Sequence, residues 1–295
     1  MVTSAGFLSA VVKWLESERA IKSAVLFGSS AGTADSASGS DRWSDIDLHI
    51  VTTDARRLSK IDWERILPNE KFCQQIVRPA TGGVSKVTAL FATGQIEMVL
   101  VPTVQFQLAR LAMGLGLHRQ IHRLRSALNE VHTCMQSGYY FLKGENTWGP
   151  FYSRIMDEMP GVRLCDSEVR EIADIFMCEL LWILQKLERG ELAAAQHSLH
   201  RSLAETNFRL IRELRLRRGQ SLPSFGLARR VEASLSATEL SWVQVSARLE
   251  QEDLRHAAWR TLDGLKAIMS ELLPLWRVPT GVDALLAQHS ASRER

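Results

Sequence analysis

Two segments, VLFGSS at residues 25–30 and SDIDLHI at residues 44–50, decide how the first part of this chain folds. The second segment alternates polar and apolar residues with the period of two that is typical of a β-strand. In such a strand the apolar residues Ile46, Leu48 and Ile50 face the core. Asp45, Asp47 and His49 then share the opposite face.

The spacing of Asp45 and Asp47 predicts a metal site. Successive residues on one face of a strand lie roughly 6.6 Å apart. Two carboxylates at that separation repel each other by about 2 to 3 kcal/mol at an effective dielectric constant near 20. A divalent cation between them reverses the sign of that interaction, and oxygen ligands favour Mg²⁺ or Mn²⁺. For His49, a packing role is favoured over a direct one.

Gly28 and Ser29 follow the first β-rich run directly. A glycine there permits a sharp turn and a close approach of the backbone to a ligand. Ser29 adds a hydroxyl and a backbone N–H at the start of a turn or short helix, a position that suits phosphate. A phosphate-binding turn followed by a metal-binding strand indicates a site for a nucleoside triphosphate.

A third acid, Glu97, lies in the apolar run IEMVLV at residues 96–101. A lone acid in such a strand is costly to bury unless it is paired or ligated. If this strand lies beside residues 46–51, Glu97 completes the metal site or acts as a base toward a hydroxyl group. The alternative is a structural ion pair with a basic residue such as Lys86.

The pattern of secondary structure divides the chain in two. A helical pattern at residues 6–19 precedes short β-rich runs, which predict an α+β module with a mixed, mostly antiparallel sheet over residues 1–103. The β-rich runs lie at residues 24–27, 46–51, 72–77, 84–91 and 96–101. Residues 104–295 are predicted to form an α-helical bundle, with helical patterns at residues 168–189, 192–216, 225–235 and 238–273. Residues 137–163, rich in Gly, Pro, Tyr and Trp, are interpreted as an irregular linker or a substrate-cleft loop. Trp148, Tyr139, Tyr140 and Tyr152 are interpreted as packing residues or an acceptor-binding wall.

Composition narrows the class of protein. The 295 residues carry 36 Lys and Arg against 33 Asp and Glu, a net charge of +3, with 45% hydrophobic residues. This is typical of a globular protein and excludes intrinsic disorder. We expect a cytoplasmic protein without a membrane span, because no apolar run is long enough. The spacing of the four cysteines argues against disulfides and structural zinc, so they are interpreted as core residues.

These motifs resemble those of the nucleotidyltransferase superfamily that includes DNA polymerase beta. Gly28-Ser29, Asp45-x-Asp47 and the later strand acid Glu97 carry the resemblance, although many relatives have Asp in place of Glu97. The run LWILQKLERGEL at residues 181–192 is similar to a helix pair of lincosamide and aminoglycoside adenylyltransferases. The resemblance spans about residues 20–101 and 168–217.

The resemblance implies a Mg²⁺-dependent enzyme that transfers a nucleoside monophosphate, with AMP from ATP as the favoured case, to a hydroxyl group and releases pyrophosphate. By position, Asp45 and Asp47 would hold the metal, and Glu97 would be a metal ligand, a base or both. Gly28, Ser29 and Ser44 would bind the nucleotide. The helical domain would provide acceptor specificity, and the acceptor would be a small antibiotic of lincosamide or aminoglycoside type.

Two alternatives remain open. One is transfer to RNA or to a protein side chain, and the other is a non-catalytic regulatory or antitoxin-like module of the same fold. The arginine run at residues 209–218 is interrupted by Glu213 and contains no aromatic residue for base stacking. It is therefore interpreted as a solvated or dimer-facing helix, so that a homodimer but no nucleic acid is expected. Lys186 and Arg189 are interpreted either as triphosphate ligands or as solvated residues at a helix end.

Overall fold

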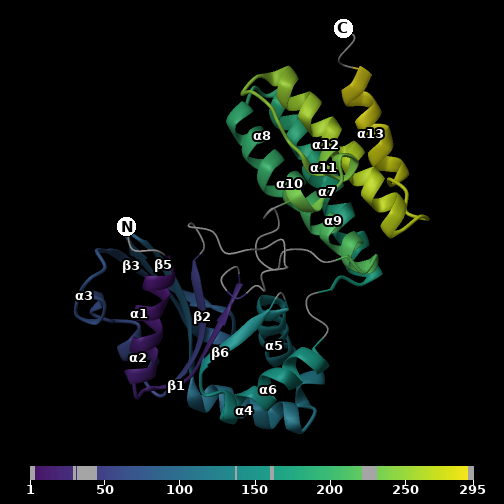
Figure 1. Ribbon diagram of the computed structural model, residues 1–295. Helices are drawn as coiled ribbons and strands as arrows, with labels where there is room; N and C mark the ends of the chain where they lie inside the picture. Colours follow the sequence, from purple (N-terminus) through teal and green to yellow (C-terminus); the bar gives the residue numbers. More distant parts are fainter. Residues whose placement is uncertain are drawn as a thin grey trace. The chain divides into compact units, whose positions relative to one another are not determined.

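The computed structural model describes residues 4–28, 31, 45–136, 138–159, 163–220 and 231–291. The chain divides into two compact units, residues 1–162 and 163–295. The first combines a mixed sheet with helices, and the elements described in the second are helical (Figure 1). The predicted fold class, an α+β module followed by α-helices, is therefore confirmed.

The strands of the first unit form one mixed sheet. The described elements of the first unit are, in chain order, α1 (Ser4–Ser17), β1 (Ile21–Phe27), β2 (Ile46–Thr52), α2 (Ala55–Leu58), α3 (Trp63–Ile66), β3 (Phe72–Ala80), the 3-10 turn η2 (Thr81–Gly83), β4 (Val84–Phe91), β5 (Gly94–Pro102), α4 (Thr103–Gly114), the 3-10 turn η3 (Leu117–Arg119), α5 (His122–Met135), β6 (Tyr139–Lys143) and α6 (Glu145–Glu158). Within the described residues the strand order is β3-β4-β5-β2-β1-β6, and only β2 and β5 pair in parallel. Each β-rich run predicted from the sequence lies within a strand of this sheet.

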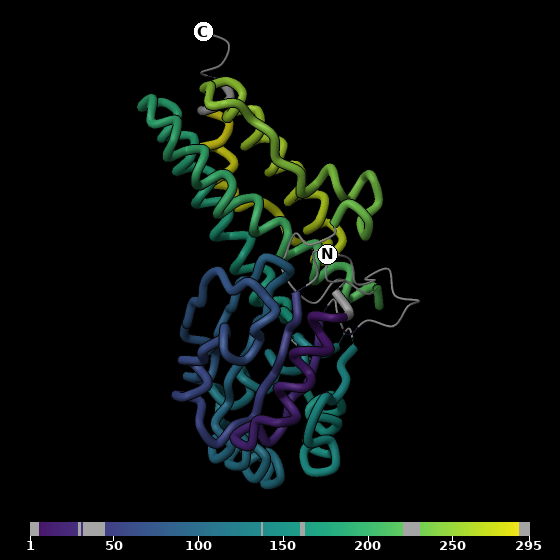
Figure 2. Tube along the Cα trace, turned by 60° about the vertical axis from the view of Figure 1, so that its left-hand side comes forward, coloured from purple at the N-terminus to yellow at the C-terminus, as the bar shows by residue number. Residues whose placement is uncertain are grey.

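One face of the sheet carries the apolar core of the first unit. Phe7, Val11 and Leu15 of α1 pack in one buried cluster with Leu48 of β2 and Met98 of β5. Helices α1, α2 and α3 lie on this side of the sheet (Figure 1), and Figure 2 shows α1 in purple alongside the strands. The period-two alternation of residues 45–50 thus has its predicted consequence, because Ile46, Leu48 and Ile50 all belong to this cluster.

The opposite face of the sheet is partly covered by α4 and α6. Phe106 of α4 and Phe151 of α6 are buried, with ring centroids 4.8 Å apart. Tyr152 of α6 is also buried and contacts the ring of His49 on β2. This face therefore has an apolar part under aromatic rings and, toward β3, β4 and β5, a polar part.

Residues 137–163 differ from the irregular linker that the sequence predicts. They include strand β6, which pairs with β1, and helix α6, which contains Pro150. The buried side chains of Trp148, Phe151, Tyr152 and Ile155 have helical spacing, and their burial stabilises the helix despite the proline. Because β6 completes the sheet, the expected boundary at residues 103/104 lies inside the first compact unit.

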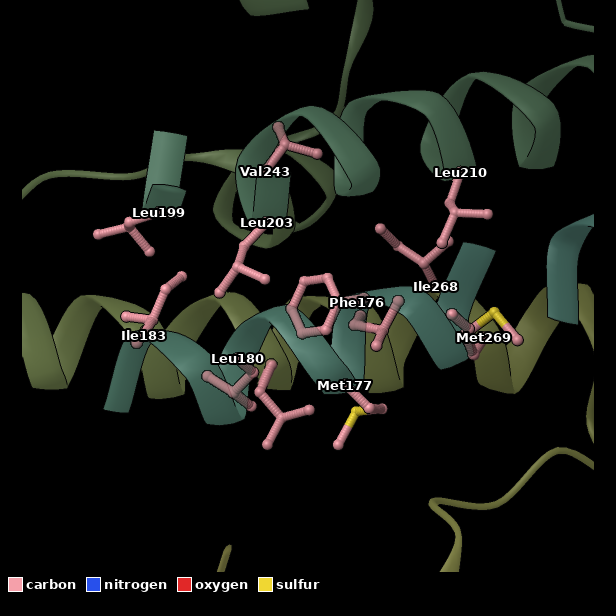
Figure 3. Close-up of a cluster of buried hydrophobic side chains, with 14 of the residues drawn as sticks. Phe176, Met177, Leu180, Ile183, Leu199, Leu203, Leu210, Val243, Ile268 and Met269 are labelled. Atoms are coloured by element: carbon pink, nitrogen blue, oxygen red, sulfur yellow. The ribbon is translucent and has the colours of Figure 1, made fainter. Parts of the chain in front are cut away.

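The second unit is built around two long helices. Its described elements are α7 (Asp166–Glu188), α8 (Leu192–Ser198), the π-helical turn η4 (Leu199–Ala204), α9 (Glu205–Arg217), α10 (Val231–Ser234), α11 (Ala237–Val243), α12 (Gln251–Leu272) and α13 (Thr280–Ala291). In Figure 3 the Phe176 ring of α7 lies among Leu203, Leu210 and Ile268, which come from three other elements. The helical pattern predicted for residues 168–189 corresponds to α7.

The helical pattern predicted over residues 238–273 corresponds to two helices, α11 and α12, which are separated by the non-helical residues 244–250. Asn207 of α9 is buried and donates hydrogen bonds to the carbonyl oxygens of Trp242, at 3.0 Å, and Thr261, at 2.8 Å. The Trp242 carbonyl also lies against Gly264 of α12, where a side chain would collide with it. This close approach holds the end of α11 against α12.

Candidate functional site

The parallel pairing of β2 with β5 brings the predicted acids together. In this register Asp47 lies opposite Glu97, and Ile46 lies opposite Ile96. Asp47 and Glu97 are half-buried on the same face of the sheet, away from the apolar core. Neighbouring strands lie about 4.8 Å apart, so the register places the two carboxylates within reach of a shared ligand.

Gly28 lies directly against Asp47. Phe27 at the end of β1 pairs with Asp47, and Gly28 follows with a φ of +76°. A Cβ atom at Gly28 would collide with Oδ2 of Asp47. The backbone conformation therefore favours glycine at this position, and a larger residue would also displace the Asp47 carboxylate. Ser29 and Ser44, the other predicted nucleotide-binding residues, lie outside the described residues.

Gln95 connects Asp45 to Glu97. Its Nε2 amide nitrogen donates to Oδ2 of Asp45 at 3.4 Å and to Oε1 of Glu97 at 3.3 Å. Thr88 on β4, which pairs with Glu97 across the strands, donates its hydroxyl to the same Oε1 at 3.1 Å. Gln95 and Thr88 are neutral donors that hold the Glu97 carboxylate on the same side as the aspartates.

Glu97 also forms the ion pair that the sequence left as an alternative. The Lys86 ammonium contacts Oε2 of Glu97, and the Arg78 guanidinium lies 3.8 Å from Oε1. The side chain of Glu97 is 16% exposed and that of Lys86 is 29% exposed. Two cations on β3 and β4 thus balance the charge of the third acid.

The donor set at this site fits a hard divalent cation. Carboxylate oxygens are the ligands that Mg²⁺ and Mn²⁺ prefer, and Asp45 and Asp47 present them beside the Gly28 turn. Among the described residues no three His, Cys, Asp or Glu side chains are grouped so as to hold a metal ion.

His49 has the packing role that the sequence favoured. It is buried, and its Nδ1 is hydrogen-bonded to the hydroxyl of Tyr152 at 2.6 Å. Burial lowers the pKa of His49 to about 4 and raises that of Tyr152 well above its ordinary value. The interpretation of Trp148 and Tyr152 as an acceptor-binding wall is therefore wrong for these two residues, since both are buried.

The four cysteines are free, and only Cys134 has a partly interior position. Cys73, Cys165 and Cys178 are exposed, so the prediction that the cysteines are core residues is wrong for these three. Burial raises the pKa of the Cys134 thiol to about 12, with further contributions from the charges of Glu130 and Asp47. The charge of Lys86 acts on the same thiol in the opposite direction. Cys134 of α5 therefore lies within electrostatic range of both Asp47 and Lys86.

The arginine run of the second unit forms ion pairs within that unit. Arg215 and Arg218 both pair with the buried Glu239, at 3.0 Å and 2.8 Å. Arg217 pairs with the buried Glu213 at 3.0 Å. Arg215 and Arg218 thus pair with an acid of α11 and Arg217 with an acid of its own helix, so these three arginines form ion pairs within the unit and not a fully solvated face.

Lys186 is also engaged within the second unit. Its ammonium contacts the Glu191 carboxylate and lies 4.9 Å from the centre of the Trp182 ring. This is an ion pair combined with a cation–π contact. The interpretation of Lys186 as a solvated side chain is therefore replaced by a local contact at the end of α7.

Sequence reasoning missed Gln95, Thr88 and Arg78 as parts of the site. Their signal is the same period-two alternation that identified the aspartates, read along the neighbouring strands. Gln95 shares a face with Glu97, and Thr88 and Arg78 reach that face through the pairing of β3, β4 and β5. The pairing itself, which follows from the tertiary fold, was needed to align them.

Similarity to known proteins is found among solved structures. No protein-family model matches the chain, and no curated protein matches it. The chain is similar to the crystal structure of an aminoglycoside 6-adenyltransferase from Bacillus subtilis, with 11% identity, a TM-score of 0.40 and coverage of 99% of this chain and 98% of that chain. It is also similar to a nucleotidyltransferase-like protein from Exiguobacterium sibiricum, with 11% identity, a TM-score of 0.31 and coverage of 90% and 74%. At these TM-scores neither similarity assigns a function to this chain. Among the described helices, none is long and apolar enough to cross a membrane.

Proposed function

We propose that this chain is a nucleotidyltransferase that moves a nucleoside monophosphate from a nucleoside triphosphate to a hydroxyl group and releases pyrophosphate. The observation that carries the proposal is the parallel register of β2 and β5, which sets Asp47 opposite Glu97. The Gln95 amide is hydrogen-bonded to both Asp45 and Glu97 and so links the third acid to Asp45. The chain turns at Gly28, directly beside Asp47. Acids on adjacent strands next to a glycine turn suit the binding of a triphosphate together with a metal ion.

The residues have separate roles in this proposal. Asp45 and Asp47 hold Mg²⁺ or Mn²⁺, and Gly28, Ser29 and Ser44 surround the phosphates. When bound, the metal supplies positive charge that neutralises the triphosphate and favours an in-line displacement. The acceptor oxygen bonds to the α-phosphorus while the bond from that phosphorus to the bridging oxygen breaks. Glu97, the third acid, either ligates the metal or takes the proton of the acceptor hydroxyl.

The donor and the acceptor are the finer part of the proposal. We infer ATP as the donor and an aminoglycoside or lincosamide as the acceptor. The support is the resemblance of residues 181–192 to a helix pair of antibiotic adenylyltransferases. On this proposal the second unit contributes to acceptor binding.

A screen for pyrophosphate release tests the reaction and identifies the substrates. The four ribonucleoside triphosphates are each incubated with Mg²⁺ and with a panel of aminoglycosides and lincosamides. We expect release that depends on both the nucleotide and one class of antibiotic. Asp47→Asn should reduce this rate at least about 100-fold, the scale expected when a group that stabilises transition-state charge is lost.

Asp54→Asn is the matched control for Asp47→Asn. Asp54 is exposed and caps α2 by accepting a hydrogen bond from the backbone N–H of Arg57, a role that asparagine also fills. The control should keep the wild-type rate. Near-normal pyrophosphate release by Asp47→Asn would show that the metal assignment is wrong.

A second candidate function is a non-catalytic module of the same architecture. The Lys86–Glu97 ion pair favours it, because the Glu97 carboxylate must give up its contact with the ammonium before it can ligate a metal ion through that oxygen. This candidate predicts no pyrophosphate release with any antibiotic, RNA or protein acceptor. Binding of a nucleotide without turnover would support it.

A further inference from the structure

Glu97 lies at the centre of a polar cluster that spans three strands. We call this the Glu97 cluster and define it by Arg78, Lys86, Thr88, Gln95 and Glu97. The cluster occupies the same sheet face as Asp45 and Asp47. It contains both the third acid of the proposed site and two cations to which the proposed reaction assigns no role.

The two oxygens of the Glu97 carboxylate have different partners. Oε1 accepts hydrogen bonds from the neutral groups of Thr88 and Gln95, with Arg78 at 3.8 Å. Oε2 faces the Lys86 ammonium. A metal ion that uses Glu97 as a ligand therefore competes with the Lys86 ammonium for the charge of this carboxylate, whereas the hydrogen bonds from Thr88 and Gln95 come from neutral groups.

We propose that the Lys86 ammonium exchanges one partner for another. It holds the Glu97 carboxylate until a divalent cation takes its place there, and it then binds a phosphate of the nucleotide. This deepens the proposed function and rests on it. Lysine suits such an exchange because its ammonium is a compact charge on a flexible stem, with donors that reorient freely. The exchange would couple metal binding to triphosphate binding through a single side chain.

The position of Lys86 supports the second half of the exchange. Its side chain is partly exposed, so the fold does not enclose it completely. The carboxylate that it contacts belongs to Glu97, which lies opposite Asp47 on the adjacent strand. The ammonium therefore lies on the same sheet face as the Asp47 carboxylate, beside which the phosphates would bind.

Mn²⁺ binding to the protein without nucleotide tests the competition directly. Free Mn²⁺ is measured by electron paramagnetic resonance during titration of the wild-type chain and of Lys86→Met, Glu97→Gln and the double variant. Met keeps much of the lysine stem and removes its charge. Arg78→Met is the matched control, because it removes a cation that lies farther from the same carboxylate, 3.8 Å from Oε1, than the Lys86 ammonium that contacts Oε2. Thermal melting confirms that each variant is folded.

The expected pattern follows from the exchange. Lys86→Met should tighten Mn²⁺ binding about five- to tenfold, the range of a modest coupling between two ligands. Arg78→Met should have a smaller effect, and Glu97→Gln should weaken binding. In the Glu97→Gln background, Lys86→Met should have no further effect, because no carboxylate remains for the lysine to hold.

The second half of the exchange, in which Lys86 binds a phosphate, is tested with inorganic tripolyphosphate. The affinity for tripolyphosphate is measured by calorimetry in the presence of saturating Mn²⁺. Lys86→Met should weaken it about fivefold or more, as expected for the loss of a charged hydrogen bond, while Arg78→Met should weaken it less. An unchanged affinity in Lys86→Met would overturn the phosphate half of the exchange.

Three outcomes overturn the competition, and they separate it from the proposed function. An unchanged Mn²⁺ affinity in Lys86→Met shows that Lys86 does not compete with the metal ion. An increase in affinity that persists in the Glu97→Gln background shows that the charge of Lys86 acts on the metal ion without involving Glu97. Either result leaves the proposed function intact if Asp47→Asn still abolishes Mn²⁺ binding. Failure of the wild-type chain to bind Mn²⁺, with or without tripolyphosphate, overturns the metal site and the exchange together.

Discussion

At the scale of single residues, the hydrogen bond between His49 and Tyr152 links the candidate site to the interior. His49 lies two positions after Asp47 on β2, and its ring is buried against Phe106 and Tyr152. Since burial disfavours the charged imidazolium, the pKa of His49 is lowered from 6.5 to about 4. The neutral ring therefore supports the strand that carries Asp47.

This burial predicts a loss of stability in mild acid. The unfolded chain takes up a proton at His49 as the pH falls below 6.5, whereas the folded chain does so only near pH 4. The contribution of His49 to stability is thus fully present above pH 6.5 and is lost between pH 6.5 and 4. Linkage gives a decrease of about 2 kcal/mol in the free energy of unfolding between pH 7 and pH 5.

Urea unfolding of His49→Asn at both pH values tests this contribution. Asparagine keeps a hydrogen-bonding group for Tyr152 but does not titrate, so the difference between pH 7 and pH 5 should shrink by that amount. His122→Asn, at an exposed position in α5, should keep the wild-type difference. An equal pH dependence in wild type and His49→Asn would contradict the assignment.

At the scale of elements, the contact between α11 and α12 depends on the absence of a side chain at Gly264. The Trp242 carbonyl oxygen occupies the space that a Cβ atom would need, and the Asn207 amide donates to that same oxygen. Backbone atoms at the end of a helix cannot move aside without breaking such bonds. One glycine therefore determines how closely the two helices approach.

Gly264→Ala should destabilise the second unit by about 1 to 3 kcal/mol, the usual cost of overpacking a tight contact. Gly281→Ala is the matched control, since Gly281 is also helical and a Cβ atom there meets open space. That control should be neutral or stabilising by up to about 1 kcal/mol. The check is thermal unfolding of both variants, and equal melting temperatures would contradict the role of Gly264.

At the scale of the whole molecule, each compact unit has its own buried core. The core of the first unit draws on α1 and the sheet, and that of the second on helices from α7 onward. Strand β6 belongs to the first unit because it pairs with β1, with Phe27 opposite Tyr139. The unit boundary consequently follows α6 and does not coincide with the end of β5.

Fragments that end at the two boundaries distinguish them experimentally. A fragment of residues 1–162 should unfold cooperatively in urea, because it keeps the full sheet and the helices on both faces. A fragment of residues 1–103 should not, because β1 loses its partner β6 and His49 loses the cover of Phe106 and Tyr152. Circular dichroism during urea titration gives the transitions, and a cooperative transition in the shorter fragment would support the boundary at residue 103.

Much of the first unit could be predicted from its sequence, because strands with one buried face alternate visibly. Residues 45–50 show this alternation, and so do residues 95–100, where Gln95 and Glu97 share the polar face. Residues 139–158 could not be interpreted in the same way. Gly149 and Pro150 suggest a loop, whereas the stability of α6 comes from the burial of its aromatic side chains against the sheet.

The sequence by itself determined that Asp45 and Asp47 share a strand face and that Gly28 follows a strand, because these relations are local. Only the tertiary structure decided that β2 pairs in parallel with β5, that Glu97 therefore lies opposite Asp47, and that Lys86 holds Glu97. The physical reason is that strand pairing depends on which buried faces pack together. Residues far apart in sequence meet only after that choice is made.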